Sequence, residues 1–196
     1  MTVACDTQMR SHFAPTHELT KWSLTFHDSS KKFKIIVVDE DKDVPDALAY
    51  HDYVNGKPVG IVLAKTIKDY LQGIDWKFGP RGVSVALSHE YLELRRDEYC
   101  NETWAAPDGW VYWAEVCDAV QDYSYPVGGV YVSDFVTKAW YAAQAPGPYD
   151  YLGHLSRPFQ VGQGGYQVRY RPGAEVQVNG EKPPYHGWRS LSRTDT

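Results

Sequence analysis

A run in the middle of the chain, Ser88-His89-Glu90-Tyr91-Leu92-Glu93, has the residue types and the spacing of a metal site on a helix. On an α-helix, His89 and Glu93 lie on one face about one turn apart, so a nitrogen and an oxygen can point at a common ion. Glu90 is turned by about 100° around the helix from His89. Its carboxylate would then lie beside the ion, where it can take a proton from an attacking water molecule.

Carboxylates farther along the chain are candidates for a third ligand. Glu115 and Asp118 lie in a short apolar stretch, where carboxylates without partners would be costly to bury. Asp97 directly follows the expected helix and could cap it or orient a neighbouring side chain. Three protein ligands would leave a fourth position for water. This is the arrangement of the H-E-x-x-H metallopeptidases, which have a second histidine at the position of Glu93.

The same spacing also has a simpler explanation. A histidine and a glutamate four residues apart on an exposed helix form a common surface pair that stabilises the helix weakly. The spacing alone does not separate this pair from a metal site. His51, between Tyr50 and Asp52, likewise has two interpretations. It is either a ligand or hydrogen-bond donor near the site, or a hydrogen-bonded histidine at the end of a strand.

Other catalytic classes lack their motifs. Ser88 has no Gly-x-Ser-x-Gly elbow, which argues against a serine hydrolase. Cys117 has no basic neighbour in the sequence that would activate it as a nucleophile. The glycine-rich stretch at 162–165 is not followed by Lys-Ser or Lys-Thr, so we reject nucleotide binding.

The composition is that of a globular chain with one core: 196 residues, 43% hydrophobic and 23% charged. A net charge of −5 argues against a nucleic-acid surface. Three cysteines are too few for a disulfide framework, and free thiols are favoured over a bridge between Cys100 and Cys117. The first residues lack the features of a signal peptide, and no apolar run approaches the ~18 residues of a membrane span. We therefore expect a cytoplasmic product that does not contact a membrane.

The metal motif falls on residues 83–96, the best helix of the sequence, because its apolar positions suit a buried helix and no Gly or Pro interrupts it. A short helical turn is expected at 67–71. Strands are expected at 22–26, at 131–136 and, as a central strand, at 33–38. Hairpins are expected at 47–64, 104–112 and 166–178, the first two around Asn55-Gly56 and Pro107-Asp108-Gly109. The sum is an α+β fold, with a small mixed sheet and one central site-bearing helix followed by loops and hairpins.

The chain is expected to divide into three parts. These are an irregular N-terminal arm at 1–20, an α+β domain at 21–150, and a C-terminal hairpin with an extended tail at 151–196. Between Arg157 and Arg193, basic side chains alternate with Tyr and Trp. Such a surface can contact nucleic acid or protein, and we expect protein partners.

Several of these pieces form a joint pattern. It consists of S-H-E-x-x-E at 88–93, Asp97-Glu98, and Glu115-Val116-Cys117-Asp118. The pattern resembles a group of uncharacterised bacterial and tailed-phage proteins described as zincin-like, which have Asp-Pro where this chain has Asp97-Glu98. Tyr50-His51 matches a further element of that group, and 132–136 and 164–166 resemble its phage-associated branch. The resemblance covers roughly residues 45–170.

The resemblance implies a zincin-like fold and a complete set of site residues. Glu90 would be the catalytic residue, His89, Glu93, Asp118 and Glu115 the metal ligands, and His51 and Asp97 supporting residues. Zinc is the implied ion, although carboxylate ligands also suit calcium or magnesium, and a metal-free carboxylate network is the alternative. Two functions follow. One is a zinc-dependent metallopeptidase with Glu90 as general base. The other is a non-enzymatic virion structural protein of the capsid, neck or tail, which contacts other virion subunits through its C-terminal tail.

Overall fold

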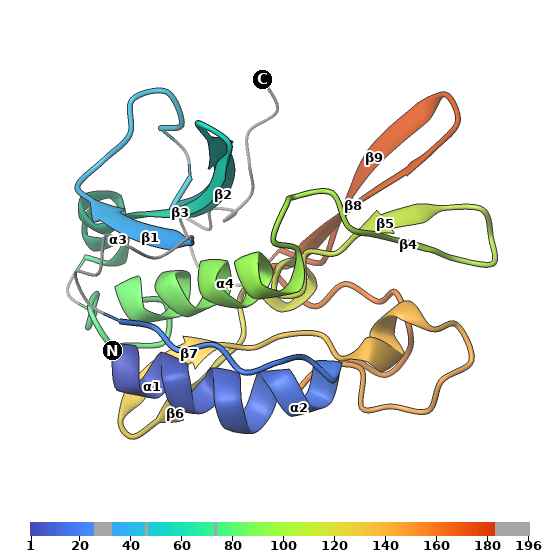
Figure 1. The fold of residues 1–196 in the computed structure, drawn as a ribbon, viewed down its shortest axis with the longest axis horizontal. Helices are drawn as coiled ribbons and strands as arrows, with labels where there is room; N and C mark the ends of the chain where they lie inside the picture. Colours follow the sequence, from blue (N-terminus) through green and yellow to red (C-terminus); the bar gives the residue numbers. More distant parts are fainter. Residues whose placement is uncertain (26–32, 46, 73, 183–196) are drawn as a thin grey trace.

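The computed structural model describes residues 1–25, 33–45, 47–72 and 74–182, and it has the expected α+β architecture. Figure 1 shows the long helix α4 (Val83–Arg96) at the centre of the molecule. A three-stranded sheet lies on one side of this helix, and an N-terminal helix with a two-stranded sheet lies on the other. Two further hairpins gather beyond its carboxyl end.

Helix α4 is covered on every face, since all its residues from Val83 to Arg95 are buried. It begins after Gly82, where a Cβ would lie 2.8 Å from the carbonyl oxygen of Trp76, so that glycine is required there. It ends at Asp97, whose backbone leaves the helical region with φ −126° and ψ 80°. The predicted bounds are confirmed. Because the helix is buried all round, its histidine and carboxylates are interior groups and not an exposed surface pair.

The N-terminal segment is helical, so the expectation of an irregular arm at 1–20 is wrong. Cys5, Met9 and Phe13 follow each other at intervals of four residues, and all three are fully buried. This apolar stripe packs a helix onto the core although polar residues separate its members. The helix runs without a break through α1 (Thr2–Thr7), the π-helical turn η1 (Gln8–Phe13) and α2 (Ala14–His17).

A three-stranded sheet carries one histidine toward α4. Its strands are β1 (Lys34–Val38), β2 (Ala49–Val54) and β3 (Lys57–Leu63), in the order β1-β3-β2. The expected hairpin of β2 and β3 is confirmed, with positive φ angles at Asn55 (51°) and Gly56 (73°). Its register places His51 opposite Gly60.

Gly60 lets this sheet approach α4 closely. A Cβ at this position would lie 3.2 Å from both Glu90 Cβ and Leu94 Cδ1. Ordinary side chains would therefore hold β3 away from the helix. The absence of a side chain at one strand position thus brings His51, on the neighbouring strand, within reach of the helix residue Glu90.

The predicted strand at 33–38 lies at the edge of the sheet and not at its centre. Ile36, Val37 and Val38 are 44%, 47% and 36% exposed. Their β-branched side chains favour a strand, but that preference does not determine its position in the sheet. The strand expected at 22–26 is not formed by residues 22–25, and Phe26 lies outside the described residues. Trp22 instead packs against the guanidinium of Arg95, 4.8 Å from the ring centre.

The remaining hairpins frame the carboxyl end of α4. A four-stranded sheet consists, in this order, of β4 (Thr103–Ala105), β5 (Val111–Trp113), β8 (Tyr166–Arg171) and β9 (Ala174–Asn179). The C-terminal hairpin therefore extends the sheet of the preceding part of the chain. The expected hairpins at 104–112 and 166–178 are confirmed, and β7 ends at Ser133, three residues earlier than expected. The other elements are α3 (Ala64–Leu71), η2 (Asp118–Val120), β6 (Ser124–Val127), β7 (Val130–Ser133) and η3 (Lys138–Tyr141).

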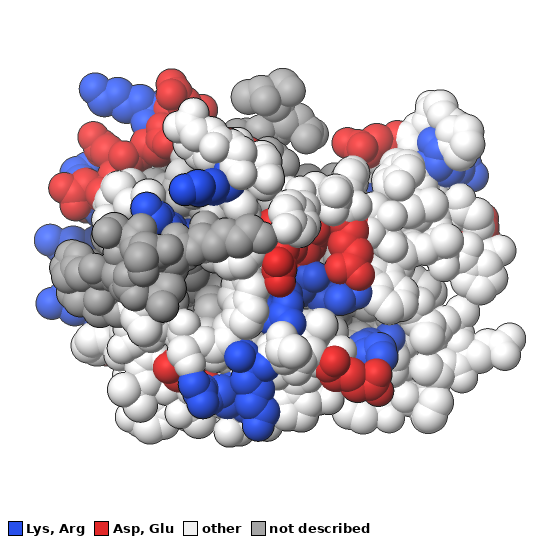
Figure 2. Space-filling model, viewed as in Figure 1, with Lys and Arg blue, Asp and Glu red and all other residues white. Residues whose placement is uncertain are grey.

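The surface mixes charges of both signs. On the face seen in Figure 2, Lys and Arg side chains lie beside Asp and Glu side chains, and exposed ion pairs such as Lys65–Glu40 are among the described contacts. The three cysteines are free thiols, as favoured from the sequence. Among the described residues, no helix has the length and apolar character needed to cross a membrane. The end of the basic and aromatic tail, residues 183–196, lies outside the described part of the chain.

Candidate metal centre

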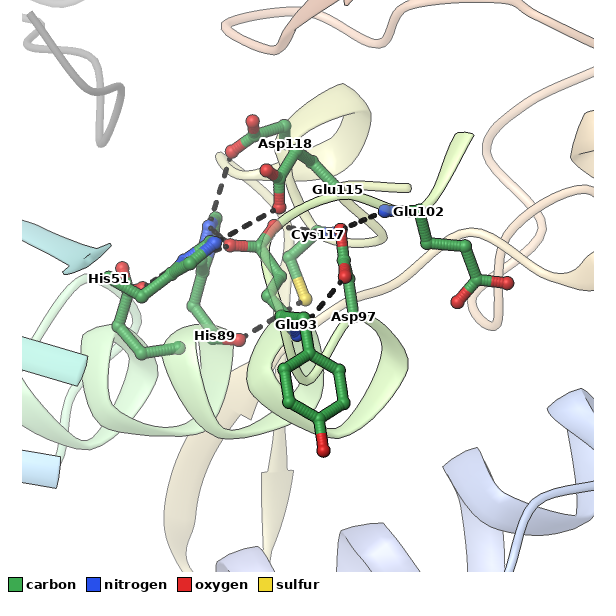
Figure 3. A network of polar contacts seen from close by, with 10 residues as sticks. His51, His89, Glu93, Asp97, Glu102, Glu115, Cys117 and Asp118 are labelled. Atoms are coloured by element: carbon green, nitrogen blue, oxygen red, sulfur yellow. Dashed lines mark hydrogen bonds and ion pairs between the residues drawn. The ribbon is translucent and has the colours of Figure 1, made fainter. Parts of the chain in front are cut away.

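Five side chains from three parts of the chain converge beside α4. They are His51 from β2, His89 and Glu93 from α4, and Glu115 and Asp118 from the segment between β5 and η2. Because these side chains could hold a metal ion, we refer to this set as the metal centre. Figure 3 shows the two histidines on one side, Glu115 and Asp118 facing them, and Glu93 between. The sequence expectation that His89, Glu93 and a downstream carboxylate would meet agrees with this placement.

His89 is positioned like one ligand of a shared ion. Its Nε2 lies 3.2 Å from Glu93 Oε2 and 3.2 Å from Asp118 Oδ1. Two ligands of one tetrahedral zinc, each bonded at about 2.0–2.1 Å, are separated by about 3.4 Å. Both distances from His89 Nε2 are close to the separation expected between two ligands of one ion. Nδ1 of His89 is buried without a hydrogen-bond partner among the described residues, so the polar contacts of this ring are on its Nε2 side.

His51 belongs to the centre as closely as His89 does. Its Nδ1 lies 3.0 Å from Glu90 Oε2 and 3.6 Å from Glu93 Oε2, and its Nε2 lies 3.6 Å from Glu115 Oε2. Glu93 Oε2 therefore lies between the two imidazoles. From the sequence, His51 was expected as a supporting residue, with a ligand role as one of two interpretations. The strand register that places it here is not visible in its spacing from the helix.

Glu90 holds His51. It is 1% exposed, and its Oε2 forms a hydrogen bond with Nδ1 of that histidine. A carboxylate that binds one ring nitrogen of a histidine orients the ring and makes the other nitrogen a better ligand. The structure thus places the expected general base in the position of an orienting group.

Asp97 organises the turn after the helix. Its carboxylate accepts hydrogen bonds from the backbone N–H groups of Tyr99 (3.3 Å) and Glu102 (2.7 Å). In Figure 3 its dashed contact runs to Glu102, on the side away from the two histidines. From the sequence, Asp97 was expected either to cap the helix or to orient a neighbouring side chain. In the structure its carboxylate binds backbone groups of the turn that directly follows the helix.

Two residues that the sequence did not single out as part of the site surround the carboxylates. The backbone N–H of Cys117 donates to Glu93 Oε1 at 3.1 Å, and the hydroxyl of Tyr166 hydrogen-bonds with Asp118. The Cys117 sulfur lies within 4.8 Å of ligand atoms of His89 and Glu93. Burial raises the pKa of this thiol well above its ordinary value, so the thiol stays protonated without a metal. No sequence motif marks either contact.

Burial and the neighbouring charges shift the pKa values of His51, His89, Glu93 and Asp118. Burial raises the pKa values of Glu93 and Asp118, and the nearby His89 opposes that rise. Burial alone would lower the pKa values of both histidines, but the carboxylates around them raise these values well above normal. The charges of this buried cluster must therefore be balanced by protons, on the imidazoles or on the carboxylates, or by a bound cation.

These shifts predict a pH dependence of zinc binding. Without metal, the raised pKa values keep the imidazoles protonated around neutral pH, whereas an ion needs them neutral. Zinc must displace protons, so its affinity should rise as the pH is raised and fall as the pH is lowered. Calorimetric titration at several pH values, in buffers of different ionisation enthalpy, measures the protons released. An affinity that does not change with pH would contradict the ligand assignment.

The five side chains offer two overlapping ligand sets that share Glu93. One set is His89 and Glu93 together with Asp118, which contacts the same His89 Nε2. The other is His51, Glu93 and Glu115, whose ligand atoms all lie within 4.8 Å of one another. Nitrogen and carboxylate ligands of this kind suit zinc and related divalent ions. No family model matches the chain, and comparisons with curated proteins and with solved structures give no match either.

Proposed function

We propose that the chain is a zinc-dependent hydrolase with a zincin-like centre, in which His89, Glu93 and Asp118 bind the ion and an acyl bond such as a peptide is cleaved. The observation that supports it best is the position of His89 Nε2, 3.2 Å from each of two buried carboxylates. Here His89 contacts two carboxylates, Glu93 and Asp118, and Glu93 also contacts a second histidine, His51. Such a group of side chains can act as a set of metal ligands.

The burial of the carboxylates supports a bound cation. The side chains of Glu93 and Asp118 are 3% and 6% exposed. Buried carboxylates are costly unless a positive charge accompanies them. A divalent ion would supply two positive charges where both carboxylates face His89 Nε2.

Two carboxylates are candidates for the base. When bound, zinc would act as a Lewis acid and activate water toward a carbonyl carbon. Glu115 has the most exposed side chain of the centre, at 25%, and its Oε2 lies 3.6 Å from His51 Nε2. Glu90 is buried, and its Oε2 is occupied by His51. We therefore assign the proton-accepting role to Glu115, the most exposed side chain of the centre, and a positioning role to Glu90.

The variants Glu115→Gln and Glu90→Gln test this assignment. Loss of a base lowers turnover by about 10²- to 10⁴-fold and leaves metal affinity almost unchanged. Loss of an orienting carboxylate weakens metal binding by about 10- to 100-fold. We expect the first result for Glu115→Gln and the second for Glu90→Gln. Zinc content and hydrolysis of a fluorogenic peptide library measure the two effects, and Glu175→Gln on the exposed strand β9 is the matched control.

The proposal fails if wild-type protein equilibrated with zinc and then dialysed retains no ion. If zinc is retained but chelation and zinc re-addition leave peptide hydrolysis at the level of a buffer blank, the metal centre stands and the hydrolase does not. An exchange of the two phenotypes, with Glu90→Gln losing only turnover, would return the base role to Glu90.

A non-enzymatic role of the same centre is the second candidate. The buried hydrogen bond between Glu90 and His51 favours it, because it occupies the carboxylate that an H-E-x-x-H enzyme keeps available. A metal held this way would stabilise the junction of β2, α4 and the 115–118 segment. In this case the chain would be a virion subunit, as the resemblance suggests, and mass spectrometry of purified particles would detect it in stoichiometric amounts.

A further inference from the structure

A second cluster of metal-ligating side chains lies outside the metal centre and shares no residue with it. Asp134 directly follows β7, and Asp150 and His154 lie on the loop that pairs with it through the bridge between Val136 and Asp150. Both aspartates are fully buried. The side chain of His154 is 45% exposed, so the cluster can be reached from solvent.

Backbone groups fix the orientation of both carboxylates. Asp134 Oδ1 accepts hydrogen bonds from the N–H groups of Phe135 (2.8 Å) and Leu152 (3.3 Å). The two oxygens of Asp150 accept from the N–H groups of Leu155 (2.7 Å) and His154 (2.9 Å). These contacts hold the carboxylates in place without using every oxygen.

The other oxygen of Asp134 points into the cluster. Oδ2 is buried, and no donor among the described residues satisfies it. Its neighbours are the carboxylate of Asp150 and Nδ1 of His154, which lies 3.8 Å away. The same Nδ1 is 3.4 Å from Asp150 Oδ2, and ligand atoms of the three residues lie within 4.8 Å of one another. A fully buried carboxylate oxygen aimed at a second carboxylate needs a positive partner.

A proton or a cation can fill this role. Burial, with the adjacent Asp150, raises the pKa of Asp134 to about 9, so without metal the Asp134 carboxyl holds a proton at neutral pH. An imidazole and two carboxylates also form a ligand set for zinc, manganese or iron(II). The His154 ring is already oriented, because it stacks on Tyr123 with ring centres 4.2 Å apart.

We propose that Asp134, Asp150 and His154 bind a second divalent transition-metal ion. The ion fastens the loop at 150–155 to the segment after β7. That junction otherwise depends on backbone hydrogen bonds such as Tyr151 N–H to the Phe135 carbonyl, at 2.9 Å. Its role is structural, since the carboxylates are held by the main chain on both sides of the junction.

The test compares metal content in variants of each centre. The full chain is equilibrated with Zn²⁺ or Mn²⁺, dialysed and analysed for metal per chain. His154→Ala should bind one equivalent fewer than wild type, and adding His154→Ala to the His89→Ala variant should remove one equivalent more. His154→Ala removes a half-exposed ring and should leave the core intact. Asp134→Asn serves as a second variant, because an amide can donate to Asp150 as a protonated carboxylate would, while lacking the ligand charge.

The outcomes distinguish this cluster from the metal centre. If His154→Ala and Asp134→Asn each lose one equivalent and the melting temperature no longer rises when that equivalent is added, the second site stands, whatever His89→Ala does. If neither variant changes the metal content, the Asp134 carboxyl holds only a proton and the proposal is overturned. A loss confined to His89→Ala likewise leaves one site, the metal centre, and overturns this proposal alone.

Discussion

The His89→Ala variant is expected to lower the zinc affinity of the metal centre by more than about 100-fold and to abolish hydrolysis. Changes that merely disturb the orientation of a ligand already weaken metal binding by about 10- to 100-fold, and His89 is itself one of the proposed ligands. Its Nε2 is the point where Glu93 and Asp118 meet. Competition with a chromophoric chelator measures the affinity. Glu93→Gln, which keeps the shape but not the charge, should have a comparable effect.

A histidine outside the metal centre provides the control. His12 contacts the hydroxyl of Tyr125 at 2.9 Å and stacks on Tyr151, so His12→Ala removes an imidazole without touching the centre. It should retain the zinc affinity of the wild type. A folded His89→Ala variant, judged by circular dichroism, that still binds zinc with wild-type affinity would exclude the proposed ligand set.

Gly60→Val is expected to destabilise the fold and to damage the metal centre together. A Cβ at this position meets Glu90 and Leu94 at 3.2 Å and Ile35 at 3.3 Å, and valine adds two methyl groups beyond it. Overpacking of this kind costs about 1–3 kcal/mol of unfolding free energy. The strand must move away from α4, and His51 on the paired strand moves with it. Urea denaturation and zinc affinity measure the two effects.

Gly60→Ala is the graded control for this prediction. Its single Cβ requires the neighbours to shift by only a few tenths of an ångström, so both losses should be smaller than in Gly60→Val. If the valine variant kept its stability and zinc affinity, the close approach of β3 to α4 would not position His51.

The elements that could be predicted are those with strong local signals. Helix α4 has uninterrupted apolar positions, a glycine before it and a non-helical aspartate after it, and its bounds were predicted correctly. The β2–β3 hairpin follows from Asn55-Gly56, which favours positive φ at both turn positions. The N-terminal helix was missed because polar residues fill the positions between Cys5, Met9 and Phe13. The edge position of β1 depends on how strands are ordered, which a β-branched run does not encode.

In the candidate site, too, contacts between residues close in sequence could be predicted, whereas contacts between distant segments could not. The pairing of His89 with Glu93 follows from helix geometry, and the carboxylate Asp118 was predicted from its apolar surroundings. The resemblance named His51 as a supporting residue, but its contacts could not be derived from spacing, because they depend on a strand register and on a glycine nine residues later. For the same reason the sequence assigned Glu90 to proton transfer, whereas the structure gives it His51 as a partner.

Because Glu93 Oε2 lies between two imidazoles, the two halves of the metal centre are thermodynamically linked. An ion or a proton bound at His89 neutralises part of the negative charge of Glu93 Oε2. His51 contacts the same oxygen, with its Nδ1 3.6 Å from it, and therefore experiences this change. Linkage is reciprocal, so occupancy near His51 must change affinity near His89 by the same factor. A double-mutant cycle on the two histidines should therefore give non-additive zinc affinities, with the non-additivity removed in a Glu93→Gln background.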